Sequence, residues 1–375
     1  MLALKIAFSL FALFLNINAW DNVKLTLESR TYFYVGGQYM NVSQPLFGEG
    51  EISTGQIYVE KLVPKTTTEK YPLIFIPGAG QTSTNFLNTP DDRSGWASYF
   101  LNKGYTVYLT DPTQRGRSPA LSVASSGGFE VAPVSYIQKY FTTSEKFAPT
   151  EWPQAKLHTQ FPGTGLVGDP SFDAFYRSQV QLQTSALISE RLNRDAELAL
   201  LDKIGPAILV THSQSGPYGW VAGDARPNTV KGIIAIEPEG PPFVNETGPT
   251  GPARVDGITR LPLVYDPPVV DIEKDLTTKV FPPPREGLAS CTLPNPRRKL
   301  VNLSKVPVVL VTGEASFHAP YDYCTVEFLK QTGVNVDWLN LVEKGLKGNG
   351  HFPFLEKNSD QVAGLVEGWL KGLKD

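Results

Sequence analysis

The stretch AILVTHSQSGP, residues 207–217, decides the fold class and suggests where chemistry takes place. A short apolar run is followed by a histidine and two serines, and then by glycine and proline. A nucleophilic serine on a sharp turn between a strand and a helix usually lies in the pattern G-x-S-x-G, because the turn leaves no room for large side chains two residues away. Neither serine here has glycine at both places, so the pattern is incomplete.

Ser213 is the better candidate nucleophile of the two serines. It follows the apolar run almost directly, and the residues two places away, Thr211 and Ser215, are both small. Ser215 would have Pro217 at that place and would extend the strand through polar residues. Taken alone, the stretch also fits an ordinary strand end with a serine capping the next helix. A catalytic interpretation therefore needs a base, an acid and an oxyanion hole from elsewhere in the chain.

The rest of the chain alternates between apolar runs and helical patterns. Residues 20 to about 65 are β-rich, and short apolar runs follow at 71–76, 105–110, 207–210, 230–236, 306–311 and 336–341. The clearest helical patterns run from about Phe172 to Ile204 and along the C-terminal end. Buried strands that alternate with helices predict an α/β fold with a mostly parallel central sheet flanked by helices.

Two regions interrupt this alternation, residues 119–171 and 241–300, which we call the first and second insertions. Both are rich in proline, glycine and aromatic residues. Loops of this length inside a compact domain usually carry function, so we predict that they form a cap or lid. The predicted domains are a signal peptide at 1–19, a core made of 20–118, 172–240 and 301–375, and the two insertions.

Only four histidines are present to supply the general base that a serine hydroxyl needs. His212 adjoins the predicted nucleophile, where the turn would direct its side chain elsewhere, and His158 lies in the first insertion. His318 follows a predicted strand. His351 lies in GNGHFPF, between the last predicted strand and the final helix. We predict His351 as the base and keep His318 as the alternative.

The sequence resembles the α/β-hydrolase superfamily through VTHSQSG, GNGH and a glycine-rich turn after an early strand, FIPGAGQTSTNF. More narrowly, NTPDDRSGWASYFLNKGYTVYLTDPTQRGRS resembles a subgroup of two-domain esterases from bacteria and fungi. The resemblance covers most of 70–240 and 300–375. It implies the chain order nucleophile, acid, histidine, in which His351 has the place of the base.

The acid has three candidates. Many α/β-hydrolases place it after a later strand, which here nominates Glu314. In the resembling esterases the acid is a glutamate at the end of the strand that follows the helix after the nucleophile. Here that strand lies in VKGIIAIEPEG, so the candidate is Glu237, with Glu239 two residues further on. A carboxylate at either strand end can orient the imidazole and stabilise the imidazolium. We favour Glu237 and keep the other two as alternatives.

The oxyanion hole is expected to take one backbone N–H from the residue after the nucleophile, Gln214. The second comes from the glycine-rich loop IPGAGQ, where Ala79 is the predicted donor and Gly80 its rival. Arg115 and Arg117 lie in TQRGRS, a loop that mainly shapes the site in the resembling esterases.

The N-terminal residues predict secretion. One lysine precedes an apolar run from Ile6 to Leu15, and Ala19 lies where a signal peptidase would cut. The run is shorter than the roughly 20 residues of a membrane anchor, so we expect no anchor after cleavage. Three N-x-[ST] sequons fit this route as predicted glycosylation sites: Asn41, Asn245 and Asn302.

The two cysteines, Cys291 and Cys324, are predicted to form a disulfide in an oxidising compartment. Two cysteines this far apart do not make a zinc site and no H-E-x-x-H pattern occurs, so we expect no metal and no cofactor. The net charge of −3 on 375 residues shows no excess of positive charge, which argues against nucleic acid as a partner.

Together these residues predict a secreted serine hydrolase that cleaves a carboxylic ester or a lactone through an acyl-enzyme, with a Ser-His-Glu triad. The Pro- and aromatic-rich insertions suggest a medium-sized, mostly apolar small-molecule ester as substrate. Acyl transfer or cyclisation in a biosynthetic route would use the same residues and stays an alternative. A catalytically silent binding member of the fold is another, although no triad member is missing.

Overall fold

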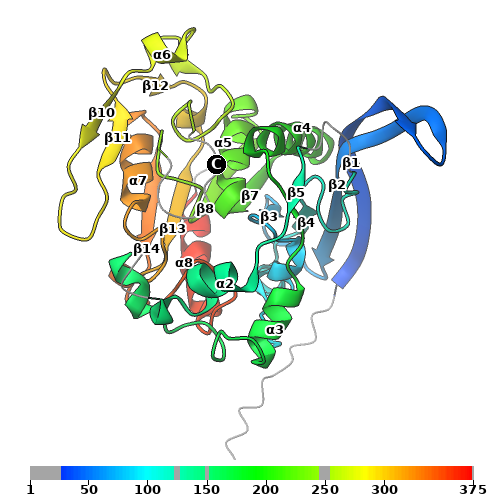
Figure 1. Cartoon of the computed structure of the whole chain (residues 1–375), viewed down its shortest axis with the longest axis horizontal. Helices are drawn as coiled ribbons and strands as arrows, with labels where there is room; N and C mark the ends of the chain where they lie inside the picture. The colour runs from blue at the N-terminus through cyan, green and yellow to red at the C-terminus, as the bar shows by residue number, and fades with distance from the viewer. Residues whose placement is uncertain (1–26, 122–126, 148–151, 245–253, 374–375) are drawn as a thin grey trace, which may run out of the picture.

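The computed structural model describes residues 27–121, 127–147, 152–244 and 254–373. An eight-stranded sheet with the order β1-β2-β4-β3-β7-β8-β13-β14 forms its centre (Figure 1). From β4 to β14 all neighbouring strands are parallel, while β1 and β2 add an antiparallel edge. The predicted α/β fold with a mostly parallel sheet is confirmed. The predicted signal peptide, residues 1–19, lies outside the described residues.

The sheet strands are β1 (Leu27–Gln44), β2 (Gly48–Pro64), β3 (Leu73–Ile76), β4 (Val107–Asp111), β7 (Ala207–His212), β8 (Val230–Ile236), β13 (Val308–Thr312) and β14 (Val336–Asn340). Every residue of β3, β4, β7 and β13 is buried. Strands covered on both faces need apolar side chains on both faces, which explains the short continuous apolar runs in the sequence.

Helices pack on both faces of the sheet. One face is covered by α4 (Ala186–Ile204), α5 (Gly216–Ala225) and α7 (Asp322–Gln331), whose apolar residues share one core cluster. The other face is covered by α1 (Trp96–Asn102) and α8 (Ser359–Lys371), which share the second cluster. The sheet therefore lies between two apolar layers, and its strand ends are left free to carry polar residues.

The helix predicted from about Phe172 to Ile204 is wrong as a single element. The structure has α3 (Pro170–Arg177) and α4, with the short strand β6 (Leu182–Gln183) between them. Asp169 caps the first helix, and the Ser185 hydroxyl caps the second by accepting from the Ile188 amide. Between them the Val180 amide donates to the Gly80 carbonyl at 2.9 Å. This tertiary bond uses backbone that a continuous helix would need for itself.

The elements in the described parts of the two insertions are short. The first contains β5 (Phe129–Glu130), α2 (Val134–Ile137), a π-turn (Gln138–Thr142) and two 3₁₀ turns (Ser144–Lys146 and Pro153–Leu157). The second contains β9 (Tyr265–Asp266), α6 (Ile272–Asp275), β10 (Thr278–Phe281), β11 (Cys291–Pro294) and β12 (Lys299–Leu300). Among the described residues, further 3₁₀ turns span Ser83–Phe86, Ser213–Ser215, Leu303–Lys305 and Val342–Lys344.

Strands β1 and β2 form a long hairpin, which confirms the β-rich pattern of the N-terminal segment from residue 27 onward. Their register runs from the pair Leu27–Pro64 to the pair Gln44–Gly48. The turn end of the hairpin extends away from the body of the molecule, and the other end joins the sheet (Figure 1).

Two of the predicted glycosylation sites lie in the described residues. Asn41 is exposed on β1, and Asn302 is partly exposed, with its side-chain oxygen accepting from Lys305 Nζ at 3.3 Å. Asn245 lies outside the described residues. Glycosylation at all three stays a prediction. Within the part of the chain that is described, no helix has the length and apolar content to cross a bilayer.

Cys291 and Cys324 form a disulfide, which joins β11 of the second insertion to α7 of the core across a sequence separation of 33 residues. We expect the double variant Cys291→Ser/Cys324→Ser to lose about 3 kcal/mol of unfolding free energy, because the unfolded chain regains the entropy of an open loop. Urea unfolding measures the loss. A reductant should destabilise the wild type and leave the double variant unchanged. Equal stability of wild type and variant would contradict the prediction.

Candidate active site

The turn from β7 to α5 holds Ser213 in a strained conformation. Its φ angle is +53°, in the left-handed region that non-glycine residues seldom adopt. The chain also passes close to its neighbours here: a Cβ on Gly216 would lie 2.4 Å from Pro238 Cβ, and one on Gly78 would lie 2.9 Å from Ser213 Cβ. Ser213 therefore lies on a crowded strand-to-helix turn of the kind that presents a nucleophile.

Ser215 points into the protein. Its hydroxyl accepts from the His212 amide at 2.8 Å and donates to the Ile76 carbonyl at 2.6 Å. The side chain thus replaces the usual glycine and also joins the end of β3 to the end of β7. The structure gives Ser215 a role in holding the turn and leaves Ser213 as the candidate nucleophile.

His351 lies beside Glu237, although 114 residues separate them in sequence. The two side chains meet at 2.5 Å, between His351 Nδ1 and Glu237 Oε2. Glu237 directly follows β8 and is completely buried. Its carboxylate also accepts from the Gly313 amide at 2.7 Å and from the Ser316 hydroxyl at 2.5 Å. These bonds fix the carboxylate, which in turn fixes the orientation of the imidazole.

The other two candidate acids are bound elsewhere. Glu314 accepts from the Gly348 amide at 2.8 Å. Glu239 forms ion pairs with Arg254 and Arg260. The structure brings Glu237 to the histidine and leaves Glu314 and Glu239 in other contacts.

Two further histidines surround His351, a cluster that the sequence did not predict. His212 Nε2 donates to the His351 carbonyl at 2.9 Å. The ring of His318 stacks on the ring of His351, with centroids 4.8 Å apart and planes 17° apart, and its Nδ1 bonds Asp322 at 2.9 Å. Both contacts depend on how loops from different strands meet, so no local sequence signal could have revealed them.

The pKa values of this cluster favour a neutral imidazole. Burial, together with His212 and His318, lowers the pKa of His351 well below its usual range. Burial lowers the pKa of His212 to about 3. Burial and the nearby Asp322 raise the pKa of Glu237. A neutral His351 is the form that can accept a proton from a serine hydroxyl.

Arg115 joins the predicted oxyanion loop to the turn between β7 and α5 that carries Ser213. This fully buried guanidinium donates to the Gly78 carbonyl at 2.7 Å and to the side-chain oxygen of Gln214. Ala79, Gly80 and Gln214 all line the same cavity as Ser213 and His351. Arg117 instead pairs with Asp111 at 2.9 Å and with Glu60 at 2.6 Å, which makes it part of the framework.

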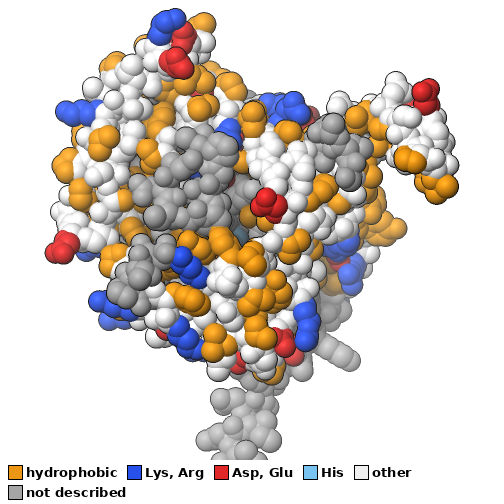
Figure 2. Space-filling view, in the orientation of Figure 1, with side chains coloured by type: hydrophobic (Ala, Val, Ile, Leu, Met, Phe, Trp, Pro, Cys, Tyr) orange, Lys and Arg blue, Asp and Glu red, His pale blue; other side chains and the backbone are white. Residues whose placement is uncertain are grey.

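The cavity has a volume of about 390 Å³. Most of its wall is apolar, with side chains from the first insertion, from the segment around β6 and from the core. The apolar lining includes Val131, Tyr136, Ile137, Phe141, Val180, Leu182, Phe317 and Phe352. In Figure 2 hydrophobic side chains also gather on the outer surface of the first insertion, below the centre of the view. The apolar wall of the cavity suits an apolar ligand with few polar groups.

Glu237, His318 and His351 are the one group of potential metal ligands found among the described residues, with one ligand atom of each within 4.8 Å of the others. The group fits a metal poorly. His351 Nδ1 and Glu237 Oε2 bond each other directly, and His318 Nδ1 bonds Asp322. The expectation that the protein needs no metal stays a prediction.

Parallel strands whose C-terminal ends carry a strained serine, a buried carboxylate and a histidine are the architecture of an α/β-hydrolase. The family model described as "Alpha/beta hydrolase family" matches residues 73–365. The chain belongs to the α/β-hydrolase family, as the resemblance of its motifs predicts.

A curated relative and a solved structure are among the proteins that this chain is similar to. The chain is 51% identical over 346 residues to "Probable secreted lipase phiG" from Fungal sp. (strain ATCC 74256), covering 92% of this chain and 90% of the relative. A solved structure described as "The Atomic Resolution Structure of a Novel Bacterial Esterase" has a TM-score of 0.64 at 20% identity, covering 94% of this chain and 98% of that one. At that identity the second likeness concerns the fold alone.

The contacts of Ser215 predict how the two serines differ. Ser215→Ala is expected to remain reactive with a fluorophosphonate probe but to lose about 1–3 kcal/mol of unfolding free energy, because a buried amide and a buried carbonyl lose their partner. Mass spectrometry of the labelled peptide and urea unfolding measure the two effects. Ser213→Ala, as the control, should lose labelling without a comparable loss of stability. If folded Ser215→Ala fails to label, the assignment of the nucleophile is wrong.

The lowered pKa of His351 predicts activity that persists into acid. A general base works only when unprotonated, so a folded-state pKa below the ordinary 6.5 extends the active range to lower pH. We expect kcat/KM for a p-nitrophenyl ester to stay level as the pH falls through 6.5 and to decline only well below it. Tryptophan fluorescence over the same range checks that the protein stays folded. An acid limb at pH 6.5 or above would be inconsistent with a depressed pKa.

Proposed function

We propose that the chain is a secreted carboxylic-ester hydrolase that works through an acyl-enzyme on Ser213. The observation that carries this proposal is the 2.5 Å bond between His351 Nδ1 and the buried carboxylate of Glu237, because His351 lines the same cavity as the strained Ser213. The named relative supports the activity and the location, since its name contains both "secreted" and "lipase". The apolar N-terminal run supports secretion independently.

The proposed reaction has two halves. His351 Nε2 takes the proton of the Ser213 hydroxyl as the oxygen attacks the ester carbonyl, and the resulting oxyanion is held by backbone amides of Ala79 and Gln214. His351 then gives its proton to the departing alcohol, which leaves an acyl group on Ser213. Water attacks this acyl group with the same general base, and the carboxylic acid leaves. Glu237 holds the tautomer of His351 throughout and stabilises the imidazolium.

The substrate class follows from the cavity. Its volume of about 390 Å³ and its largely apolar wall favour an ester of medium size with an apolar acyl or alcohol part. The first insertion supplies part of that wall, through Val131, Tyr136 and Phe141, and so acts as a cap over the ester. A lactone would use the same residues, because ring opening proceeds through the same acyl-enzyme.

The test compares two glutamates that the chain offers as a matched pair. Glu237→Gln is expected to lower kcat for p-nitrophenyl esters by about 10³–10⁴-fold, because an amide cannot stabilise the imidazolium or hold its tautomer. Glu314→Gln should remain near wild type, since Glu314 does not contact His351 and the amide oxygen of glutamine can still accept from the Gly348 amide. Steady-state kinetics on a panel of p-nitrophenyl esters and lactones measures both.

Labelling with a fluorophosphonate decides whether the mechanism holds at all. The wild type should be modified at Ser213 with loss of activity, and Ser213→Ala should be neither labelled nor active. Full activity in Glu237→Gln together with loss in Glu314→Gln would overturn the acid assignment. Failure of the folded wild type to react at Ser213 would overturn the whole mechanism.

A further inference from the structure

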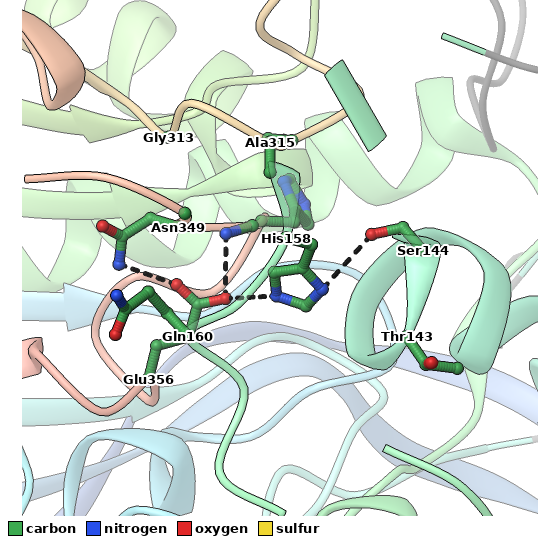
Figure 3. A network of polar contacts seen from close by, with 12 residues as sticks. Thr143, Ser144, His158, Gln160, Gly313, Ala315, Asn349 and Glu356 are labelled. Atoms are coloured by element: carbon green, nitrogen blue, oxygen red, sulfur yellow. Dashed lines mark hydrogen bonds and ion pairs between the residues drawn. The ribbon is translucent and has the colours of Figure 1, made fainter. Parts of the chain in front are cut away.

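His158 is the one histidine of the four that does not line the active-site cavity or contact another histidine. It belongs to the first insertion, and only 3% of its surface is exposed. Its Nε2 lies 2.8 Å from Glu356 Oε1, and its Nδ1 lies 3.3 Å from the Ser144 hydroxyl (Figure 3). Nδ1 also lies 3.5 Å from Glu145 Oε2. Both ring nitrogens therefore have partners, one in the core and the others in the insertion.

Glu356 connects this histidine to the loop that carries His351. Its Oε1 accepts from His158, and its Oε2 accepts from Asn349 Nδ2 at 2.8 Å (Figure 3). Oε1 also accepts from the Gly350 amide at 2.8 Å. Glu356 is almost completely buried. One carboxylate thus holds the two residues directly before His351.

The first insertion packs tightly against the loop that carries His351. The amides of Thr159 and Gln160 both donate to the Gly348 carbonyl, at 3.0 Å and 3.2 Å. A Cβ on Gly350 would lie 2.8 Å from His158 Nε2, and one on Gly348 would lie 2.0 Å from the Thr159 hydroxyl. The backbone of the loop therefore lies directly against the insertion, and its two glycines are required by this contact.

Core residues hold the same loop from the other side. The Ala315 amide donates to the Asn349 carbonyl at 2.8 Å, and His212 Nε2 donates to the His351 carbonyl at 2.9 Å. The contacts through Glu356 complete the support on the side of the insertion. A shift of the loop would change the 2.5 Å contact between His351 and Glu237.

We propose that His158 is a positioning residue for catalysis: it joins the first insertion to the His351 loop through Glu356 and so holds the general base in place. This inference rests on the proposed function, because it assigns His351 as the base. His158 itself acts through Glu356 and Gly350 and does not reach the substrate.

The charges around His158 support this role. Burial alone would lower its pKa, but the bonds to Glu145 and Glu356 outweigh burial and raise the pKa to about 9. These are the two described carboxylates that face the ring, with the Ser144 hydroxyl beside them. Protonated His158 therefore stabilises the folded state. This stabilisation is complete below the ordinary pKa of about 6.5 and is lost as the pH rises through about 9.

The experiment compares His158→Gln and Glu356→Gln with wild type. We expect both variants to fold and to bind p-nitrophenyl esters with KM within about twofold, while kcat per active site, counted by fluorophosphonate titration, falls about 10- to 100-fold because the base is misplaced. The wild type should also lose kcat as the pH rises through 9, and His158→Gln should lack this limb. Tyr176→Phe is the control, since it removes another bond to the insertion, to the Ala132 carbonyl at 3.2 Å.

Hydrogen exchange gives a readout that does not depend on activity. The peptide containing residues 347–356 should be protected in the wild type and in Tyr176→Phe, and should exchange faster in His158→Gln. Unchanged exchange in this peptide, or unchanged kcat per titrated site in the folded variants, overturns the inference. If the wild type hydrolyses no ester and does not label, the proposed function fails, and the exchange comparison alone decides whether His158 holds the loop.

Discussion

The buried carboxylate of Glu237 is the constraint on which the rest of the site depends. Taking a carboxylate out of water costs several kcal/mol unless its oxygens find donors. Here the donors are the Gly313 amide, the Ser316 hydroxyl and His351 Nδ1, which come from the segment after β13 and from the loop before α8. Satisfying one side chain therefore requires the ends of two neighbouring strands and a distant loop to meet in one place.

The fold could be predicted from the sequence where a buried element has a recognisable apolar pattern. Strands such as β3, β7 and β13 are covered on both faces, so their sequences are continuous apolar runs. The helix predicted between 172 and 204 failed for the opposite reason. Periodicity alone does not reveal that Ser185 starts a new helix, or that the Val180 amide bonds the Gly80 carbonyl in a loop about 100 residues earlier.

The positions of the candidate site residues could be predicted where chain order determines them, but not where they depend on packing between loops. The carboxyl ends of parallel strands share one edge of a sheet, so the residues after β7 and β8 had to lie near each other. Strands β8 and β13 are neighbours at that edge, which is why sequence alone left Glu237 and Glu314 open. The roles of His212, His318 and His158 depend on contacts between loops, for which the sequence carries no periodic or motif signal.

The proposed mechanism would explain why many buried polar groups surround Ser213, because it needs preorganised donors. Donors that stabilise an oxyanion are effective when they need not move during the reaction. Backbone loops do not hold such positions alone, and here each loop has a buried side chain that fixes it. Arg115 joins the Gly78 carbonyl to Gln214, Ser215 joins β3 to β7, and Glu356 holds Gly350. Buried polar side chains at this edge of the sheet thus hold the loops in fixed positions, as the chemistry proposed for Ser213 would require.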